Sequence, residues 1–498
     1  MENRGRVRVG PDGGLRTPVG KGERRADRQV QETLLREQVR KVLSPLRKRI
    51  DPGAFAALEK AGFSFDWIAG ISIGAINAAL ICGNRKEDRL AALETFWRLQ
   101  QTRSADAPAR EQLPSETVVF SREQIVEFAT GMPSKVFGPP YRPFDQDRFI
   151  ARLPGPPYAF IDRVTRIDPP PWVLAPDGWV ETGCEINPED WFFRSNRAPF
   201  MPICILMEIA LQACGFLAAY MGSALQSEKD LHFRNLDGDA VLHVNVRPMA
   251  VPLQTRARLL QYSAAGDMLI QHYAFEVHQA GRMIYDGKTS FGFFTPEALA
   301  HQAGLPAADR PAADTRPRNA GADPPIRLED TAPLTPDDPH TEPGETCAIP
   351  SRALRMIDRI DCFEPDGGAH GLGYVRGVKT IDPGDWFFKA HFYQDPVCPG
   401  SLGIESFVQL LRFAADRFWP EYRQTHTMEL LAPAPHTWRY RGQILPTNRR
   451  VDVEAVITER QDQPQPFITA DGYLKSDGLY IYKMHHFGLR LIPRDIPS

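Results

Sequence analysis

The residues best suited to chemistry stand close together in the C-terminal part of the 498-residue chain. The segment that begins at His391 reads HFYQDPVCPGSLGIE, so a histidine and an aspartate precede an apolar run that contains an acid. A neutral imidazole can accept a proton near pH 7. Gly400, at the expected start of a helix, offers a backbone N–H and the positive helix end to a developing negative charge. The segment therefore predicts a general base next to an oxyanion site.

Proton-transfer chemistry of this kind also needs an acid. Two glutamates lie in strongly apolar runs, Glu208 in ICILMEIALQ and Glu405 in SLGIESFVQ. Burial disfavours the charged form of a carboxyl, raises its pKa and keeps it protonated. Gln212 and Gln409 each follow a glutamate by one helical turn, and we interpret them as supporting hydrogen-bond partners in the helix region. The residue types alone leave both glutamates open as the acid.

The chain contains an internal duplication. It reads IDRVTRID from Ile161 and IDRIDCFEPDGG from Ile357, and DWFF begins at Asp190 and again at Asp385. A shared order of motifs is typical of a repeat. In each copy an apolar helix is followed by strand-like runs with alternating apolar residues. These patterns predict an α+β fold with two antiparallel sheets, each wrapped around a central apolar helix.

The string from His391 to Glu405 resembles the active-site segment of bacterial hot-dog-fold 3-hydroxyacyl-[acyl-carrier-protein] dehydratases, whose pattern is HFxGDPVMPGxLxxD/E. The histidine, the aspartate, both prolines, Gly400 and the acid stand at the same offsets, whereas Gln394 replaces the usual glycine. The context from FSREQIVEFATG onward is similar to the dehydratase units of polyunsaturated fatty-acid synthases and related iterative polyketide synthases. This resemblance covers roughly residues 115–495.

The resemblance implies a double hot-dog fold and a lyase that converts 3-hydroxyacyl thioesters to 2-enoyl thioesters in fatty-acid or polyketide biosynthesis, with double-bond isomerisation as a further activity. The substrate would be carried on the phosphopantetheine of an acyl carrier protein, with no other cofactor and no metal. The expected partners are the acyl carrier protein, other synthase subunits and a second copy of the chain in a homodimer. A non-catalytic hot-dog scaffold that binds acyl groups is the alternative.

In this family the base and the acid of one site come from opposite hot-dog units, so His391 would face Glu208. The reciprocal site would pair Glu405 with the first copy's counterpart of the histidine. That counterpart is Arg194 when counted back from the helix and Asn196 when counted forward from DWFF. Since neither is a histidine, we predict one working site and one degenerate site around Glu405.

A second motif lies near the N-terminus, where the chain reads FDWIAGISIGAINAALICGN around Ser72. It resembles the nucleophile elbow of patatin-like phospholipases, in which Ser72 would be the nucleophile. The Gly-rich oxyanion loop and the downstream catalytic aspartate of that family are missing. We therefore predict a truncated α/β fragment without activity, with a serine lipid acyl hydrolase as the alternative.

The bulk composition restricts the class of protein. A net charge of −3, from 59 basic and 62 acidic residues, argues against nucleic-acid binding. The seven cysteines are scattered without a CxxC pair, which indicates reduced thiols and a cytoplasmic location. We expect no transmembrane segment, because no apolar run reaches the roughly 18 uninterrupted residues that a span needs. The polar, arginine-rich N-terminus lacks the apolar core of a secretory signal.

These features divide the chain into six parts. They are a basic, disordered or helical tail (1–45), the patatin-like fragment (46–100), a connector (101–150), a first hot-dog without the catalytic histidine (151–296), an extended Pro-rich linker (297–350) and a second hot-dog with the histidine (351–495).

Overall fold

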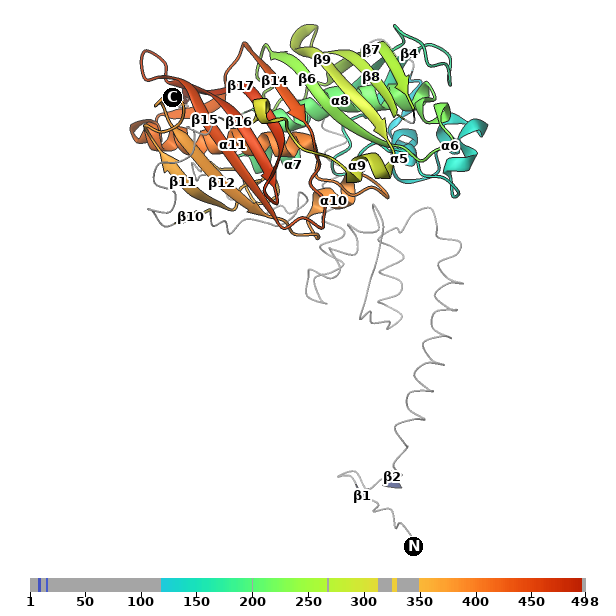
Figure 1. Ribbon diagram of the computed structural model, residues 1–498, viewed down its shortest axis with the longest axis horizontal. Coiled ribbons are helices and arrows are strands. Elements are labelled where there is room, and N and C mark those ends of the chain that lie inside the picture. The colour runs from blue at the N-terminus through green and yellow to red at the C-terminus, as the bar shows by residue number, and fades with distance from the viewer. Residues whose placement is uncertain are drawn as a thin grey trace. The chain divides into compact units, whose positions relative to one another are not determined.

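The computed structural model (Figure 1) describes residues 118–198, 200–266, 268–311, 325–328 and 349–494, together with two short strands near the N-terminus. These two strands, β1 (Arg8–Val9) and β2 (Leu15–Arg16), pair with each other. The contacts divide the chain into Met1–Pro114 and Ser115–Ser498, and the second unit holds the rest of the described structure. Ser72 and the patatin-like fragment lie outside the described residues, so that prediction is not tested.

The first copy contains a long apolar helix that is followed by four long strands. Its elements are β3 (Phe120–Ser121), α5 (Arg122–Thr130), α6 (Ser134–Phe137), η1 (Pro139–Phe144), β4 (Arg163–Asp168), β5 (Trp179–Cys184), α7 (Trp191–Asn196), α8 (Ile203–Tyr220), η2 (Ser223–Gln226), β6 (His232–Leu242), β7 (Leu253–Ala265), β8 (Met268–Gln279), β9 (Arg282–Phe294), α9 (Pro296–Ala300) and η3 (Ala307–Asp309).

The second copy repeats the pattern of a short helix, a long helix and a meander of strands. Its elements are β10 (Ile326–Arg327), β11 (Arg359–Glu364), β12 (Tyr374–Thr380), α10 (Trp386–Ala390), α11 (Gly400–Phe418), η5 (Pro420–Tyr422), β13 (His426–Leu430), β14 (Ala434–Tyr440), β15 (Arg450–Gln461), β16 (Phe467–Ser476) and β17 (Leu479–Pro493).

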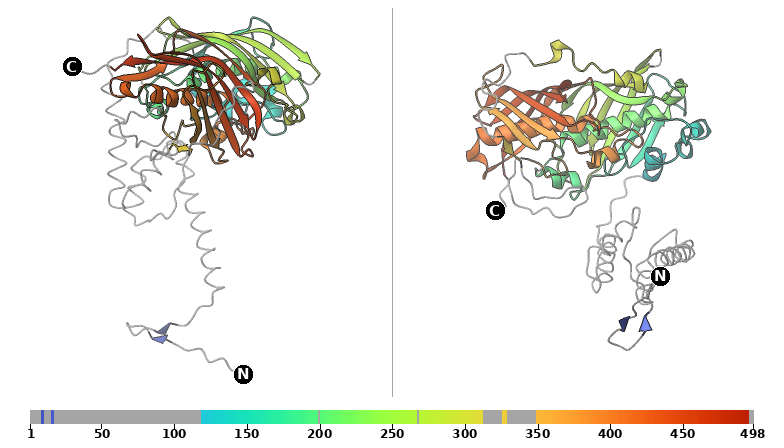
Figure 2. Two further views of the ribbon diagram at one scale, coloured as in Figure 1. Left: turned by 60° about the vertical axis from the view of Figure 1, so that its left-hand side comes forward. Right: turned by 60° about the horizontal axis from the view of Figure 1, so that its bottom comes forward.

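The strands of both copies form one antiparallel sheet of 15 strands, in the order β10-β11-β12-β15-β16-β17-β14-β6-β9-β8-β7-β5-β4-β3, with β13 beside β17. The copies join where β6 pairs with β14, from Leu242 opposite Ala434 to Asp237 opposite Arg439. The prediction of two separate sheets was therefore wrong. As edge strands of separate sheets, β6 and β14 would each leave backbone N–H and C=O groups unpaired. These groups form hydrogen bonds with each other across the boundary between the copies. Figure 2 shows the two halves side by side from two further directions.

Each long helix packs against the strands of its own copy, which is the hot-dog arrangement expected from the sequence. Helix α8 contacts β5, β7 and β8, helix α11 contacts β12, β15, β16 and β17, and the two helices contact each other. Helix α8 is long and apolar enough to cross a membrane, with a mean hydropathy of 1.8, but 94% of that stretch is buried inside the protein. A helix that is apolar all round is typical of a core position.

Two segments outside the predicted hot-dog boundaries also pack on the core. Residues 118–150 contribute Phe128, Phe137 and Tyr141 to the hydrophobic core, and β3 pairs with β4. Part of the expected extended linker is ordered as α9 and η3, because Leu299 and Leu305 are buried. Four of the five described cysteines, Cys184, Cys204, Cys214 and Cys398, are buried.

Candidate active site

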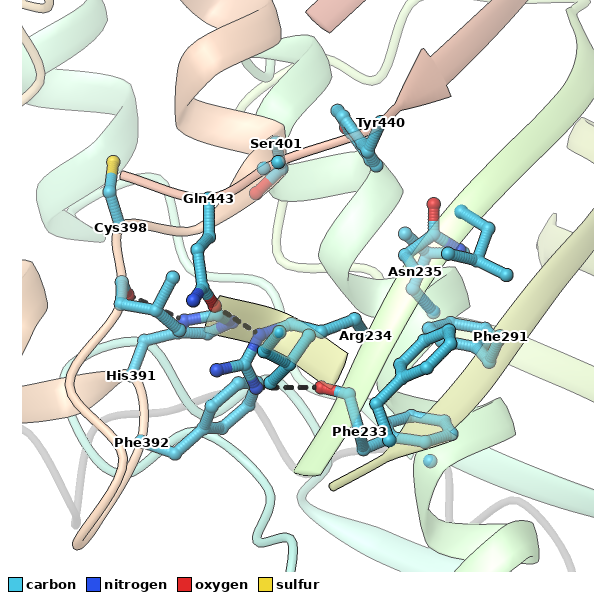
Figure 3. Close-up of a pocket in the computed structure, with 18 of the residues that line it drawn as sticks. Phe233, Arg234, Asn235, Phe291, His391, Phe392, Cys398, Ser401, Tyr440 and Gln443 are labelled. Atoms are coloured by element: carbon cyan, nitrogen blue, oxygen red, sulfur yellow. Dashed lines mark hydrogen bonds between the residues drawn. The ribbon is translucent and has the colours of Figure 1, made fainter. Parts of the chain in front are cut away.

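A cavity of about 370 Å³ lies between the two copies (Figure 3). Helix α8, strands β6 and β9 and the residues around α9 form one side of it, and the loop after α10, the start of α11 and β14 form the other. Its polar lining comprises Arg152, Glu208, Gln212, Arg234, Asn235, Gln302, His391, Ser401, Tyr440, Arg441, Gln443 and Tyr482. The structure thus brings His391, Glu208, Gly400 and Gln212 together in one cavity.

His391 follows α10 directly, and its side chain is buried with 8% exposed surface. Its Nδ1 lies 2.9 Å from the carbonyl oxygen of Val397. Because a carbonyl oxygen only accepts, Nδ1 carries the proton and Nε2 is the basic nitrogen. Burial lowers the pKa of His391 to about 3, so the imidazole is neutral at pH 7.

Asp395, the aspartate of the motif, connects the loop after His391 to the first copy through hydrogen bonds. Both carboxylate oxygens of Asp395 accept hydrogen bonds from Arg234 on β6, at 2.7 and 2.9 Å. Arg234 also donates from Nε to Gln443 at 3.0 Å. Burial alone would raise the pKa of Asp395, but hydrogen bonds from His232 and Arg234 hold it well below its usual range. Asp395 is therefore a charged anchor between the copies rather than a proton donor.

Glu208 is buried in the second turn of α8 and accepts two hydrogen bonds. Ser401 donates from Oγ to Oε1 at 2.6 Å, and Gln212 donates from Nε2 to Oε2 at 2.9 Å. Ser401 Oγ also lies 3.0 Å from the hydroxyl of Tyr158. Desolvation raises the pKa of Glu208, although the bonds from Ser401 and Gln212 act in the opposite direction. The carboxyl group is thus suited to hold and release a proton.

Gly400 is the first residue of α11 and lies against the ring of Tyr440. A Cβ at position 400 would be 2.8 Å from Cζ of Tyr440, so a larger residue would displace the ring. The first N–H groups of a helix have no partner within it and can bind an oxyanion.

Tyr440 was not identified from the sequence. Its hydroxyl is buried, lines the cavity and has no hydrogen-bond partner among the described residues. Burial raises the pKa of Tyr440 well above its usual value, so the hydroxyl stays protonated and can donate. The alternation of Trp438 and Tyr440 with the polar residues Thr437 and Arg439 was the available signal in the sequence, because alternate residues of a strand face the same side. In the structure Tyr440 is on the buried face of β14.

The two glutamines lie where the sequence analysis placed them, but they also reach beyond their helices. Gln212 accepts from the backbone N–H of Phe160 and donates to the carbonyl oxygen of Tyr158, both at 2.9 Å. Gln409 makes the equivalent bonds with Met356 and Leu354, at 2.8 and 3.0 Å. These bonds fix α8 to the segment that leads into β4, and α11 to the segment that leads into β11.

The second site is built differently around Glu405. Asn196, at the end of α7, is buried and accepts a hydrogen bond from Arg412 at 2.8 Å, whereas Arg194 is only partly buried. The structure therefore puts Asn196 rather than Arg194 at the buried end of the short helix, where His391 stands in the other copy. Glu405 lies beside Cys204, and burial raises its pKa to about 7.

A residue-by-residue comparison of the two long helices explains the difference. Pro202 and Pro399 are the equivalent N-cap residues, so each position of α8 corresponds to the position 197 residues later in α11. Ile203 therefore stands in place of the helix-start glycine, and Cys204 in place of the serine that bonds Glu208. The second site has neither the histidine nor the glycine of the first.

The fold and the cavity define a double hot-dog protein with a histidine and a glutamate from opposite units in one cavity. The model of the FabA-like domain matches residues 153–288 and 349–485, one match in each copy. The chain therefore belongs to the FabA-like family.

Two kinds of relatives accompany this family match. The chain is 32% identical over 399 residues to a subunit of the polyunsaturated fatty acid synthase of Thraustochytrium sp., and the aligned part is 74% of this chain but only 26% of that protein. A putative thioesterase from Novosphingobium aromaticivorans aligns with 66% of this chain and 100% of its own, at 12% identity and a TM-score of 0.33. The 12:0-ACP thioesterase of Umbellularia californica aligns with 64% and 94%, at 8% identity and a TM-score of 0.30. The similarity to these two thioesterase structures is too low to bear on the activity of the chain.

Proposed function

We propose that the chain dehydrates 3-hydroxyacyl thioesters to 2-enoyl thioesters, with His391 as the base and Glu208 as the acid. The observation that carries the proposal is their placement in one cavity between the two copies, beside Gly400 at the start of α11. Membership of the FabA-like family and the similarity to a polyunsaturated fatty acid synthase subunit support a role of this type in fatty-acid synthesis.

The reaction begins when Nε2 of His391 removes a proton from C2 of the thioester. The electrons of the broken C–H bond move toward the thioester carbonyl, whose oxygen is held by the N–H of Gly400 and the hydroxyl of Tyr440. They then form the C2–C3 double bond as the C3–O bond breaks. Glu208 gives its proton to the departing hydroxyl, which leaves as water.

The low pKa of His391 means that the imidazole holds the proton of C2 only briefly. A buried imidazolium is costly because burial disfavours the charged form. During the reaction, enolate charge and then the carboxylate of Glu208 appear in the same cavity, and a nearby negative charge stabilises the imidazolium. Transfer of the proton from His391 back to Glu208 restores both groups for the next cycle.

The proposal is tested with synthetic 3-hydroxyacyl coenzyme A thioesters, by following the conjugated enoyl thioester and the loss of water by mass spectrometry. We expect turnover by the wild type and a fall of about 100-fold or more for His391→Ala, since a positioned base contributes about 10² to 10⁴ in rate. If His391→Ala dehydrated as fast as the wild type, the acyl-binding scaffold without catalysis would be the better account.

The partners follow from the proposed substrate. We propose that the acyl group arrives on the phosphopantetheine of an acyl carrier protein and that the chain acts with other synthase subunits, as the name of the relative suggests. Homodimer formation and a cytoplasmic location are part of the same proposal. Isomerisation of the double bond would use the same histidine to return a proton to the chain.

A further inference from the structure

The catalytic cavity extends along α8 away from Glu208 and ends at Gly215. The two residues are seven positions apart, which corresponds to about 10 Å along a helix. Apart from Gln212, the residues of this stretch are apolar and include Leu211 and Phe291. Leu153 and Phe233 meet Gly215 at the far end. An apolar channel that leads away from the reacting groups is suited to a hydrocarbon chain.

Gly215 lies between this cavity and a neighbouring one. This second cavity of about 20 Å³ begins on the other side of Gly215 and continues along α8 to Ala218 and Ala219. The two cavities share Arg152, Leu153, Gly215 and Phe233 as lining residues. A Cβ at position 215 would lie 3.1 Å from Cδ2 of Leu153 and 3.6 Å from Cε1 of Phe233. Any side chain larger than hydrogen would therefore project into the space between these two residues.

The other copy shows what a large residue does at this position. Gly215 of α8 corresponds to Arg412 of α11, because the N-caps of the helices are 197 residues apart. Arg412 is 2% exposed and donates to both the side-chain and the backbone oxygen of Asn196, at 2.8 and 2.9 Å. The pocket next to Arg412 has a volume of only about 60 Å³, and Glu405 is not part of its lining.

We propose that Gly215 sets the length of acyl chain that the site accepts. On this view, which rests on the proposed function, the acyl chain lies along α8 from Glu208 to Gly215. Leu153 and Phe233 form the end wall, and a longer chain gains room by displacing them toward the second cavity. The glycine keeps this route open in one copy, and Arg412 occupies the equivalent space in the other.

The test compares the wild type with Gly215→Leu, using binding of butyryl and hexadecanoyl coenzyme A measured by calorimetry. Both are saturated and cannot be dehydrated, so the result does not depend on the reaction. We expect Gly215→Leu to weaken hexadecanoyl binding by about 10- to 200-fold, the range that small changes in an apolar pocket produce. Butyryl binding should change less than about twofold and reports that the variant is folded.

Gly215→Ala and Leu153→Ala are smaller changes that test the same proposal if Gly215→Leu does not fold. Gly215→Ala should give a smaller loss for hexadecanoyl coenzyme A, and Leu153→Ala should strengthen its binding relative to butyryl. Equal effects on both ligands, or none, in all three variants would overturn the proposal. Turnover of the corresponding 3-hydroxyacyl thioesters is a separate arm: if they bind with the expected length dependence but are not dehydrated, the proposed function fails and the inference about Gly215 stands.

Discussion

The buried acid of the second site, Glu405, predicts a specific dependence of stability on pH. Its side chain is 1% exposed, and burial raises its pKa from 4.5 to about 7. One pKa unit corresponds to 1.36 kcal/mol, so this rise is worth about 3 kcal/mol. The folded state holds the proton more tightly than the unfolded state. The stabilising contribution is therefore complete below about pH 4.5 and is lost as the pH rises to about 7.

Glu405→Gln should abolish this loss, because glutamine resembles the protonated acid and does not ionise. The measurement is urea unfolding followed by tryptophan fluorescence, with the variant and the wild type compared at about pH 5 and pH 8. From pH 5 to pH 8, the free energy of unfolding of the variant should rise relative to that of the wild type by most of the 3 kcal/mol. The pKa of His391 also changes on folding. Because His391 is present in both proteins, its contribution cancels in the difference between their free energies of unfolding.

Glu189→Gln is the matched control, because Glu189 is exposed. The difference in the free energy of unfolding between Glu189→Gln and the wild type should be the same at both pH values. If the difference between Glu405→Gln and the wild type were also independent of pH, Glu405 would be ionised in the folded protein and the argument from burial would be refuted.

Two further variants test groups that touch the proposed substrate or position the acid. Tyr440→Phe should lower kcat by about 100-fold, as expected for loss of one oxyanion donor, without lowering the melting temperature, since the hydroxyl has no partner in the described structure. Activity within about twofold of the wild type would exclude the hydroxyl as a donor. Ser401→Ala removes a hydrogen bond that lowers the pKa of Glu208, so the alkaline limb of the pH profile of kcat should move to higher pH. An unmoved limb would show that Ser401 does not act on the acid.

The sequence predicted those parts of the site that depend on local patterns. The motif from His391 to Gly400 could be identified because its residues are consecutive and their offsets are characteristic. The apolar run around Glu208 made it a candidate acid, and the family resemblance paired it with His391. The structure brings both residues into one cavity. The assignment of their roles stays a prediction until the variants are measured.

The remaining features depend on contacts that no local pattern encodes. The single sheet arises from pairing between β6 and β14, which are about 200 residues apart in sequence. The segment after β9 looks like an extended linker by composition, but Leu299 anchors it over the cavity. Tyr440 belongs to no motif, and its contact with Gly400 appears only in the structure, where β14 lies next to the start of α11.

The most direct test of the central claim is dehydration of a 3-hydroxyacyl thioester by the wild type, Glu208→Gln and Glu405→Gln, with folding checked by circular dichroism. The two glutamates occupy the same position in the two copies, so each variant is the control for the other. We expect Glu208→Gln to lose activity by about 100-fold or more and Glu405→Gln to keep it. The reverse pattern would contradict a site shared between the two copies.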